Sequence, residues 1–156
     1  MAHADLCREI VHRGHCVENH SLAHRGTFPF LTLGGFRREI AAAQAALTQV
    51  TGIAPRFFRA PAGLRNPLLD PVLHEHGLDL VTWTRRGFDT RCRDASVVAA
   101  RLVRGLAAGD ILLIHDGHAA RTASGVPVAL EALPRVLDAV QAAALRPVTL
   151  RRALEP

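Results

Sequence analysis

The chain has 156 residues, 49% of them hydrophobic and 21% charged, which suits one globular domain with a sizeable core. Its net charge is +5 and all 19 of its cationic side chains are arginine, but they form no long basic run and no aromatic stacking platform accompanies them, so nucleic-acid binding is not expected. No apolar stretch is long enough to predict a membrane span, the start lacks a secretory pattern, and three scattered cysteines make no disulfide framework, so we expect a cytoplasmic protein.

The first half of the chain alternates helix and strand signals. Apolar Leu6, Ile10 and Val11 share one face of a first helix that Gly14 ends, and Asn66 before a proline marks a later helix start. The elements expected here are a helix over 4–13, a strand at 15–17, a loop over 25–35, a helix over 36–51, a strand over 56–60 and a helix over 66–77.

The second half continues the alternation. The elements expected here are a strand over 78–83, a loop over 85–94, a helix over 95–107 that Asp94 can cap, a strand over 110–115, a helix over 126–145 and a last strand over 146–150. The strand over 110–115 is almost wholly apolar, which is typical of a strand buried on both faces. Regular alternation of strands and helices predicts an α/β fold with mostly parallel strands. Four or five strands are few for a closed barrel, so either the sheet is open or its beginning is missing.

Two histidines stand out in "ENHSLAHRG". His20 and His24 are four residues apart, which puts both imidazoles on one side of a helical or turn-like segment, within reach of one cation. The alternative is a solvated loop that happens to contain two histidines.

A second motif, "FFRAPAGLRNP", follows an apolar strand. Arg59 at the strand end can pair with a carboxylate, while Pro61 and Gly63 fix a turn that points backbone N–H groups at a ligand. A plain strand-to-helix turn with a surface arginine explains the same residues. Trp83, the only tryptophan, fits the core as well as a site, and Asp89 by itself is an ordinary loop acid.

The segment "ILLIHDGH" gives the strongest local signal. His115 ends an apolar strand, where a histidine is either a satisfied core residue or an acid–base group at the mouth of the sheet. Asp116 and His118 fit the turn that follows.

Taken in order, His-x3-His, Arg-x-Pro-x-Gly, Trp…Asp and Leu-x-His resemble the motifs of the NodB-like polysaccharide deacetylases, also called carbohydrate esterase family four. The resemblance runs over essentially the whole chain. It implies a truncated, distorted (β/α) barrel, with residues 1–156 as a single domain that is incomplete at its N-terminus. It also implies a metal-dependent hydrolase that removes an N-acetyl group from an N-acetylhexosamine-containing glycan or glycolipid, with that carbohydrate as the partner.

The resemblance implies a role for each matching residue. "HSLAH" looks like the family's metal motif, so His20 and His24 would be ligands of a divalent cation, most often Zn²⁺. A catalytic zinc takes three protein ligands and a water, polarises the carbonyl under attack and acidifies the water. Arg59 would orient the catalytic aspartate. Asp89 would pair with His115 and keep it protonated as the general acid.

The same resemblance implies which residues line the substrate groove. Pro61, Ala62 and Gly63 would form one side, and the backbone N–H that follows Pro61 would help to hold the oxyanion. The family usually has an aromatic residue where this chain has Ala62, so the backbone donor is kept and an aromatic wall for a sugar ring is not. Trp83 would line the other side, and Leu113 would contact the acetyl methyl group.

One family motif has no match in this sequence. The family begins with a strand that ends in Thr-Phe-Asp-Asp-Gly, whose first Asp is the catalytic base and whose second is the third metal ligand. Two histidines without that aspartate are expected to bind a metal much more weakly. The alternative hypothesis is therefore a catalytically inactive fragment or pseudoenzyme that retains weak metal or glycan binding.

Overall fold

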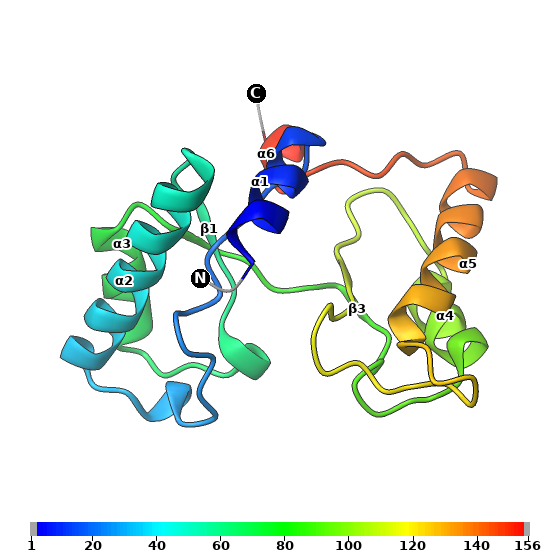
Figure 1. Ribbon diagram of the computed structural model, residues 1–156, viewed down its shortest axis with the longest axis horizontal. Coiled ribbons are helices and arrows are strands. Elements are labelled where there is room, and N and C mark those ends of the chain that lie inside the picture. Colours follow the sequence, from blue (N-terminus) through cyan, green and yellow to red (C-terminus); the bar gives the residue numbers. More distant parts are fainter. Residues whose placement is uncertain (1–2, 155–156) are drawn as a thin grey trace. The chain divides into compact units, whose positions relative to one another are not determined.

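The computed structural model describes residues 3–154, which form two compact units (Figure 1). The first unit contains the residues up to Thr82 together with those from Thr149 onward, and the second is Trp83–Val148. Each unit has its own two-stranded parallel sheet and its own apolar core. The parallel pairing confirms the α/β expectation. No helix within residues 3–154 has the length and hydropathy needed to cross a membrane.

The first unit is mostly helical around a short sheet. Its elements are α1 (Ala4–His12), the 3-10 helix η1 (Phe28–Phe30), α2 (Leu33–Thr51), β1 (Phe57–Phe58), the 3-10 helix η2 (Pro61–Gly63), α3 (Leu69–Glu75), β2 (Asp79–Leu80) and α6 (Leu150–Ala153). The first helix is confirmed, but no residue of α1 is buried, and Leu6 on its expected apolar face is 58% exposed.

The longest helix, α2, starts earlier than expected. The loop predicted over 25–35 is wrong at its end, because α2 begins at Leu33 and η1 precedes it. The Thr32 hydroxyl accepts the N–H of Gly35 at 3.3 Å and caps the helix there. Gly35 also lies against Leu31, 3.2 Å from where a Cβ would stand, so a glycine lets this first turn form. Gly52, with φ +73°, ends the helix as expected.

The sheet of this unit is narrower than the sequence suggested. Strand β1 pairs with β2 in parallel, and Asn19 adds one bridge to Phe58. The strand predicted at 15–17 is wrong. Among the described residues between the end of α1 and the start of β1, Asn19 alone pairs with β1. The reason lies in Glu18, whose carboxylate accepts the backbone N–H groups of Arg56 and Phe57 at 2.7 and 3.0 Å, in place of a neighbouring strand.

Three phenylalanines form the centre of the first core. The Phe28 ring packs edge-on against Phe36 at 5.0 Å between centroids and is stacked on Phe58 at 5.8 Å. The helix predicted from Asn66 starts only at Leu69, because Pro67 follows Asn66, whose side chain accepts the N–H of Leu68 at 2.8 Å. The remaining buried members of this core are Ile40, Ala60, Leu69, Val72, Leu73 and Leu78.

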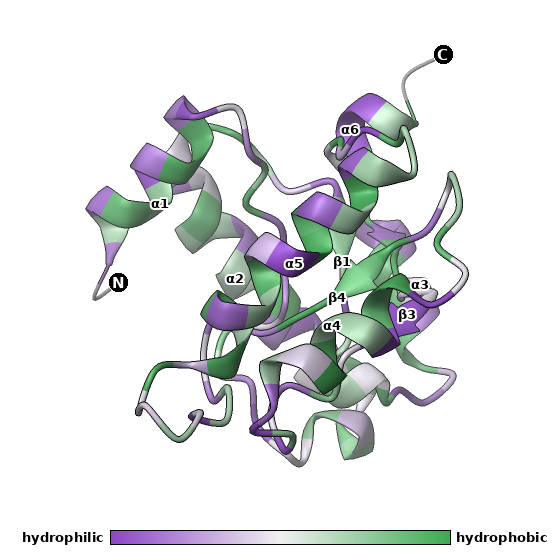
Figure 2. Cartoon of the chain, turned by 90° about the vertical axis from the view of Figure 1, so that its right-hand side faces the viewer, coloured by the Kyte–Doolittle hydropathy of each residue, from purple (hydrophilic) through white to green (hydrophobic). Residues whose placement is uncertain are grey.

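The second unit pairs two helices with two strands. Its elements are β3 (Arg85–Arg86), α4 (Ala95–Val103), β4 (Leu112–Leu113) and α5 (Val128–Ala142). Figure 1 shows α4 and α5 side by side, and their facing side chains form the second core. Figure 2 shows green and purple bands in succession along α5, as expected of a helix with one apolar face.

Several expected boundaries in this unit are wrong, and Arg85 explains two of them. The loop predicted over 85–94 begins with strand β3, where the guanidinium of Arg85 binds the Asp110 carboxylate at 2.6 Å. The same guanidinium donates to the carbonyls of Arg104 and Gly105, so α4 ends at Val103 rather than at residue 107. Asp94 caps α4 as expected, because its carboxylate accepts the backbone N–H groups of Ser96 and Val97.

The last two strand expectations also need correction. Residues 110–115 were expected to form a strand buried on both faces, but β4 has two residues, of which Leu113 is buried and Leu112 is only half-buried. The strand predicted over 146–150 is absent from the described chain. Thr149 instead accepts the N–H of Arg152 at 3.3 Å and starts the short helix α6.

Candidate functional site

The histidines of "HSLAH" lie in a tight turn, not in a helix. Their ring centroids are 4.8 Å apart and the rings meet edge to face at 62°. Ser21 and His24 have left-handed backbone, with φ of +69° and +47°, which is uncommon for residues that carry a side chain. The turn brings the two imidazoles together although the backbone between them is not helical.

Three side-chain oxygens hold this turn in place. Asn19 Oδ1 accepts the N–H of Ser21, and Ser21 Oγ accepts the N–H of His24, both at 3.0 Å. Glu39 Oε2, from α2, accepts the next two backbone N–H groups after Ser21, at 3.2 and 3.1 Å. Sequence reasoning missed Asn19 and Glu39. The signal for Asn19 was a polar residue immediately before the histidine pair, whereas nothing in the local sequence marks Glu39.

The structure brings the histidine turn and the arginine motif together within the first unit. His20 Nδ1 lies 2.7 Å from the carbonyl oxygen of Arg59, and Arg59 donates its backbone N–H to Asn19 at 3.0 Å. The His20 contact requires a proton on Nδ1, which leaves the lone pair on Nε2, the tautomer of a histidine that ligates a metal.

The Arg59 side chain is half-buried and only partly satisfied. Its Nη2 donates to the carbonyl of Thr82 at 3.1 Å, while its Nε is buried and has no hydrogen-bond partner in the described chain. No carboxylate among residues 3–154 forms an ion pair with this guanidinium. Burial lowers the pKa of Arg59 from its ordinary value, because desolvation disfavours the charged form. An incoming carboxylate would satisfy this group.

The turn after Arg59 presents a backbone donor. Pro61–Gly63 form η2, and Ala62 at its centre has φ +55°. The Gly63 and Leu64 N–H groups bond within the turn, at 2.9 and 3.1 Å, whereas the N–H of Ala62 donates to no acceptor among the described residues. A free N–H on an exposed turn is a suitable donor for an anionic oxygen.

A buried carboxylate orients the histidine of the last motif. Asp89 is 0% exposed, and its Oδ1 lies 2.9 Å from His115 Nδ1. Its Oδ2 accepts the backbone N–H of His115 at 2.7 Å. Because a carboxylate only accepts, the proton lies on Nδ1 of His115, and Nε2 is the nitrogen left for a substrate. The pair fixes both the position and the tautomer of the imidazole.

The two remaining predicted site residues also lie in the second unit. Leu113 is buried in β4, two residues before His115. Trp83 is half-buried, and the guanidinium of Arg86 lies over its ring with Cζ 5.6 Å from the centroid. Each unit thus gathers its own predicted residues: the histidine turn, Arg59 and η2 in the first, and the Asp89–His115 pair, Trp83 and Leu113 in the second. No group of three His, Cys, Asp or Glu side chains in residues 3–154 is placed to hold a metal ion.

Backbone strain concentrates at these motifs. Within residues 3–154, six non-glycine residues have positive φ, and all but Ala144 lie in or beside the predicted motifs. Such conformations cost about 1–3 kcal/mol each and persist where the surrounding structure imposes them. The five motif residues are Ser21, His24, Ala62, Phe88 and His118.

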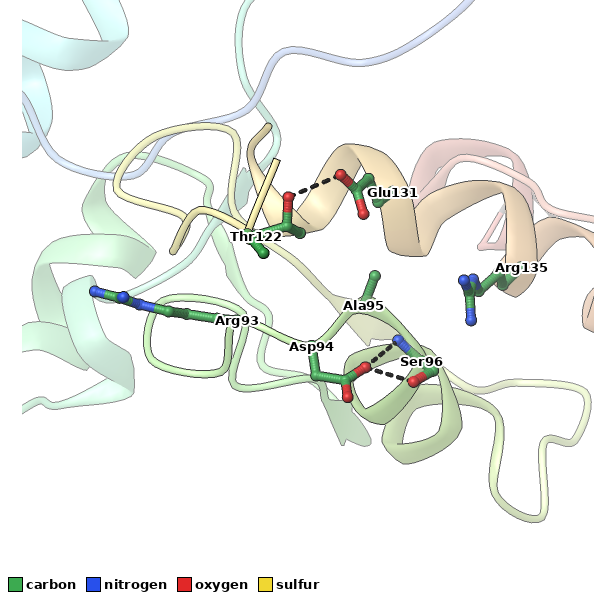
Figure 3. A pocket seen from close by; sticks show the side chains of 8 residues that line it. Arg93, Asp94, Ala95, Ser96, Thr122, Glu131 and Arg135 are labelled. Carbon is green, nitrogen blue, oxygen red and sulfur yellow. Dashed lines mark hydrogen bonds between the residues drawn. The ribbon is translucent and has the colours of Figure 1, made fainter. Parts of the chain in front are cut away.

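A cavity of about 510 Å³ lies at the start of α4 and contains none of the predicted site residues (Figure 3). Its two carboxylates are already used as acceptors: Asp94 caps α4, and Glu131 accepts hydroxyl protons from Thr122 and Ser124 at 2.8 Å. These hydrogen bonds hold the pKa values of both acids below their ordinary range. The cavity is lined by Arg93, Asp94, Ala95, Ser96, Thr122, Ala123, Glu131 and Arg135.

Comparison with known proteins gives a consistent result. A polysaccharide deacetylase family model matches residues 1–81. The chain is 31% identical over 122 residues to the peptidoglycan-N-acetylglucosamine deacetylase PgdA of Listeria monocytogenes, covering 76% of this chain and 25% of that protein.

Solved structures agree on the fold. A family 4 acetyl xylan esterase from Clostridium thermocellum, in complex with a cobalt ion, is 26% identical with a TM-score of 0.82, covering 97% of this chain and 69% of that chain. A pseudoenzyme of the CE4 family from Bacillus anthracis is 19% identical with a TM-score of 0.84, covering 97% of this chain and 50% of that one.

The fold and the motif order define an α/β protein of the family 4 carbohydrate-esterase type, present here as a partial NodB-type barrel. The chain belongs to the polysaccharide deacetylase family. This confirms the family resemblance and the fold class that the sequence indicated. The chain spans about a quarter of the length of the curated relative it matches.

Proposed function

We propose that this chain carries two metal-ligating histidines and the acid–base histidine of a hydrolase that removes an N-acetyl group from an N-acetylhexosamine-containing glycan or glycolipid. The observation that carries the proposal is the buried Asp89, which accepts hydrogen bonds from both the backbone and Nδ1 of His115. Burying a carboxylate is costly, its hydrogen bonds to His115 offset part of that cost, and such buried acid–imidazole pairs are common at sites of proton transfer. Membership of the polysaccharide deacetylase family supports an acetamido group as the reacting group.

His20 and His24 are the proposed ligands of a divalent cation, and we take Zn²⁺ as the first candidate. Paired imidazoles suit zinc and cobalt in ligand type, and the cobalt complex of the C. thermocellum esterase supports a metal of this kind. When bound, the cation would polarise the amide carbonyl and activate water. A catalytic zinc takes three protein ligands, and no group of three candidate ligands is placed together within residues 3–154.

The other residues of the chain then have separate tasks. His115 Nε2 donates a proton to the leaving amine, and Asp89 stabilises the imidazolium before that transfer. The backbone N–H of Ala62 donates to the developing oxyanion. Pro61, Gly63, Trp83 and Leu113 contact the sugar and its acetyl group.

The base and the third ligand are assigned to carboxylates outside these residues, in a longer form of the same domain. Arg59 supports this assignment, because it presents a half-buried guanidinium with a buried, unsatisfied Nε. An aspartate beside it would pair with the cation and satisfy the orphaned donor.

Calorimetric titration of Zn²⁺ into the purified chain tests the metal assignment. We expect binding that weakens at least about tenfold in both His20→Ala and His24→Ala, because each change removes one of two ligands. The matched control is His74→Ala, an exposed histidine on α3, which should bind like the unchanged chain. Equal binding by all four proteins would overturn the assignment.

Acetate release from N-acetylglucosamine oligomers, with Zn²⁺ or Co²⁺ added, tests the reaction. Release by the chain and loss of release in His115→Ala would support the hydrolase. A form of the protein extended at its N-terminus should then be faster, by the about 10²–10⁴-fold that a general base contributes.

An inactive domain with weak metal or glycan binding is the second candidate. The incomplete ligand set within residues 3–154 favours it. Zinc binding that needs both histidines, combined with no acetate release in either the short or the extended form, would establish this alternative.

A further inference from the structure

Two arginines converge on the aromatic residues next to Asp89. The guanidinium of Arg86 lies over the rings of Trp83 and Phe88, with Cζ 5.6 and 4.9 Å from the centroids. Arg101, on α4, lies over the same Phe88 ring at 5.7 Å. We call Trp83, Arg86, Phe88 and Arg101 the arginine–aromatic cluster, and all four belong to the second unit.

The two cations of this cluster have no anionic partner. Neither Arg86 nor Arg101 forms an ion pair within the part of the chain that the structure describes. Several other arginines of the chain do pair with an Asp or Glu side chain. Arg86 is half-buried, and its Nε is buried with no hydrogen-bond partner. A partly desolvated guanidinium attracts an anion more strongly than one surrounded by water. Contact with aromatic rings compensates only part of that desolvation.

The cluster presents its central ring on a fixed backbone. Phe88 is 46% exposed and has φ +58°, a conformation that is strained for a bulky residue. Gly87 holds the backbone against α4, because a Cβ there would lie 2.9 Å from Val98 and 3.2 Å from Leu102. The next residue, Asp89, is fixed by its two contacts to His115. An exposed aromatic ring with a strained backbone and two cations beside it is a surface suited to binding.

We propose that the arginine–aromatic cluster binds a carboxylate-bearing sugar residue of the glycan. The guanidinium fork of an arginine matches a carboxylate bidentately, and an exposed aromatic ring can pack against the C–H face of a sugar. The proposal rests on the proposed function for its carbohydrate ligand and extends it from a neutral N-acetylhexosamine to an acidic neighbour. A nucleic acid fits less well, because one ring and two cations form neither a stacking series nor a basic stripe.

The test compares two oligosaccharides by calorimetry on the intact chain, at low ionic strength and without metal. One is a neutral N-acetylglucosamine oligomer, and the other alternates N-acetylglucosamine with glucuronic acid at equal length. We expect the acidic oligomer to bind about tenfold more tightly, since charge-assisted bidentate pairs are strong. Equal affinity for the two oligomers would overturn the proposal, and so would equally tight binding of a single-stranded oligonucleotide of the same charge.

Variants assign the preference to the cluster. Arg101→Gln, on the surface of α4, and Arg86→Gln should each reduce the preference at least about fivefold, because each removes one partner of the carboxylate. Circular dichroism would reveal whether Arg86→Gln fails to fold. In that case Arg101→Gln still tests the proposal. The matched control is Arg135→Gln, an arginine of the same unit that lines the cavity beside α4 and lies outside the cluster. Loss of the preference in the control alone, or in none of the variants, would contradict the proposal.

This result is separable from that of the proposed function. His20→Ala and His24→Ala remove the metal ligands and should leave the preference for the acidic oligomer unchanged. A retained preference without acetate release would therefore reject the hydrolase alone. Acetate release from neutral oligomers without any acidic preference would reject the cluster alone.

Discussion

Two buried polar residues, Asn19 and Asp89, stand out in an otherwise apolar interior. They are the only buried polar or charged side chains within residues 3–154, at 1% and 0% exposure. Asn19 donates to Gln44 at 2.8 Å and to the Ile40 carbonyl at 3.2 Å, while its oxygen accepts from Ser21. Burying a polar group is costly unless it is hydrogen-bonded. Asn19 directly precedes His20, and Asp89 binds His115, so both buried polar residues lie at predicted motif histidines.

Asp89→Ala should destabilise the second unit by about 2–3 kcal/mol, because the backbone N–H and Nδ1 of His115 both lose their acceptor in a half-buried place. Urea denaturation followed by circular dichroism measures the change. Asp116→Ala, an exposed acid one residue after His115, is the control and should lie within about 0.5 kcal/mol of the unchanged chain. Equal effects at the two positions would show that the Asp89 contacts do not stabilise the fold.

Glu39→Ala should loosen the histidine turn without unfolding α2, because Glu39 holds two backbone N–H groups of the turn with one oxygen. We expect the amide protons of Leu22 and Ala23 to exchange at least about tenfold faster, measured by NMR in the absence of metal. Glu39→Gln keeps an acceptor oxygen and should restore part of the protection. Arg38→Ala, its exposed neighbour, should change nothing.

At the scale of elements, two helix ends could be predicted from the residues beside them, whereas the extent of the strands could not. Gly52 ends α2 and Asp94 caps α4 as expected, because both signals act on the backbone next to them. Strand pairing depended on side chains from distant segments. Glu18 accepts the N–H groups of Arg56 and Phe57. Arg85 lies in strand β3, where a loop was expected, and binds the carbonyls that follow α4.

The site residues divide in the same way, into those that local sequence marks and those that only the fold brings together. The motif residues were recognisable because their order and spacing are characteristic of the family. Glu39 was not, because it reaches the histidine turn from the middle of α2 and only the folded structure brings it there.

The stability of the contact between Asp110 and Arg85, which holds strand β3, should depend on pH. The carboxylate accepts from Arg85, from the N–H of Ala107 and from Thr84, which lowers its pKa from 3.8 to about 2. The folded pKa lies below the unfolded one, so its stabilisation is present above about pH 4 and is lost as the pH falls toward 2. The melting temperature should therefore fall over this range. In Asp110→Asn the fall should be shallower, and an unchanged slope would contradict the assignment.

At the scale of the molecule, the chain has two cores that share no residue. One is built on Phe28, Phe36 and Phe58, and the other lies between α4 and α5. Separate cores allow a chain to unfold in more than one step. The largest buried side chains of each core all come from one of the two units.

We therefore expect calorimetry to record two unfolding transitions. Ile40→Ala in the first core and Val98→Ala in the second, both 0% exposed, should each lower one transition and leave the other in place. The cost should be about 2–5 kcal/mol for the isoleucine, since the change leaves a cavity. A single transition lowered by both substitutions would mean that the two cores unfold as one.

The strained residues have a consequence for protein engineering. Glycine adopts positive φ without a steric penalty, so replacing Ser21, His24, Ala62, Phe88 or His118 by glycine relieves local strain. A library selected only for heat resistance is expected to enrich glycine at these positions, and with it to discard an imidazole of the histidine turn and the ring of the arginine–aromatic cluster. Directed evolution of a more stable variant should therefore alternate rounds of heating with rounds that screen for the proposed metal and oligosaccharide binding.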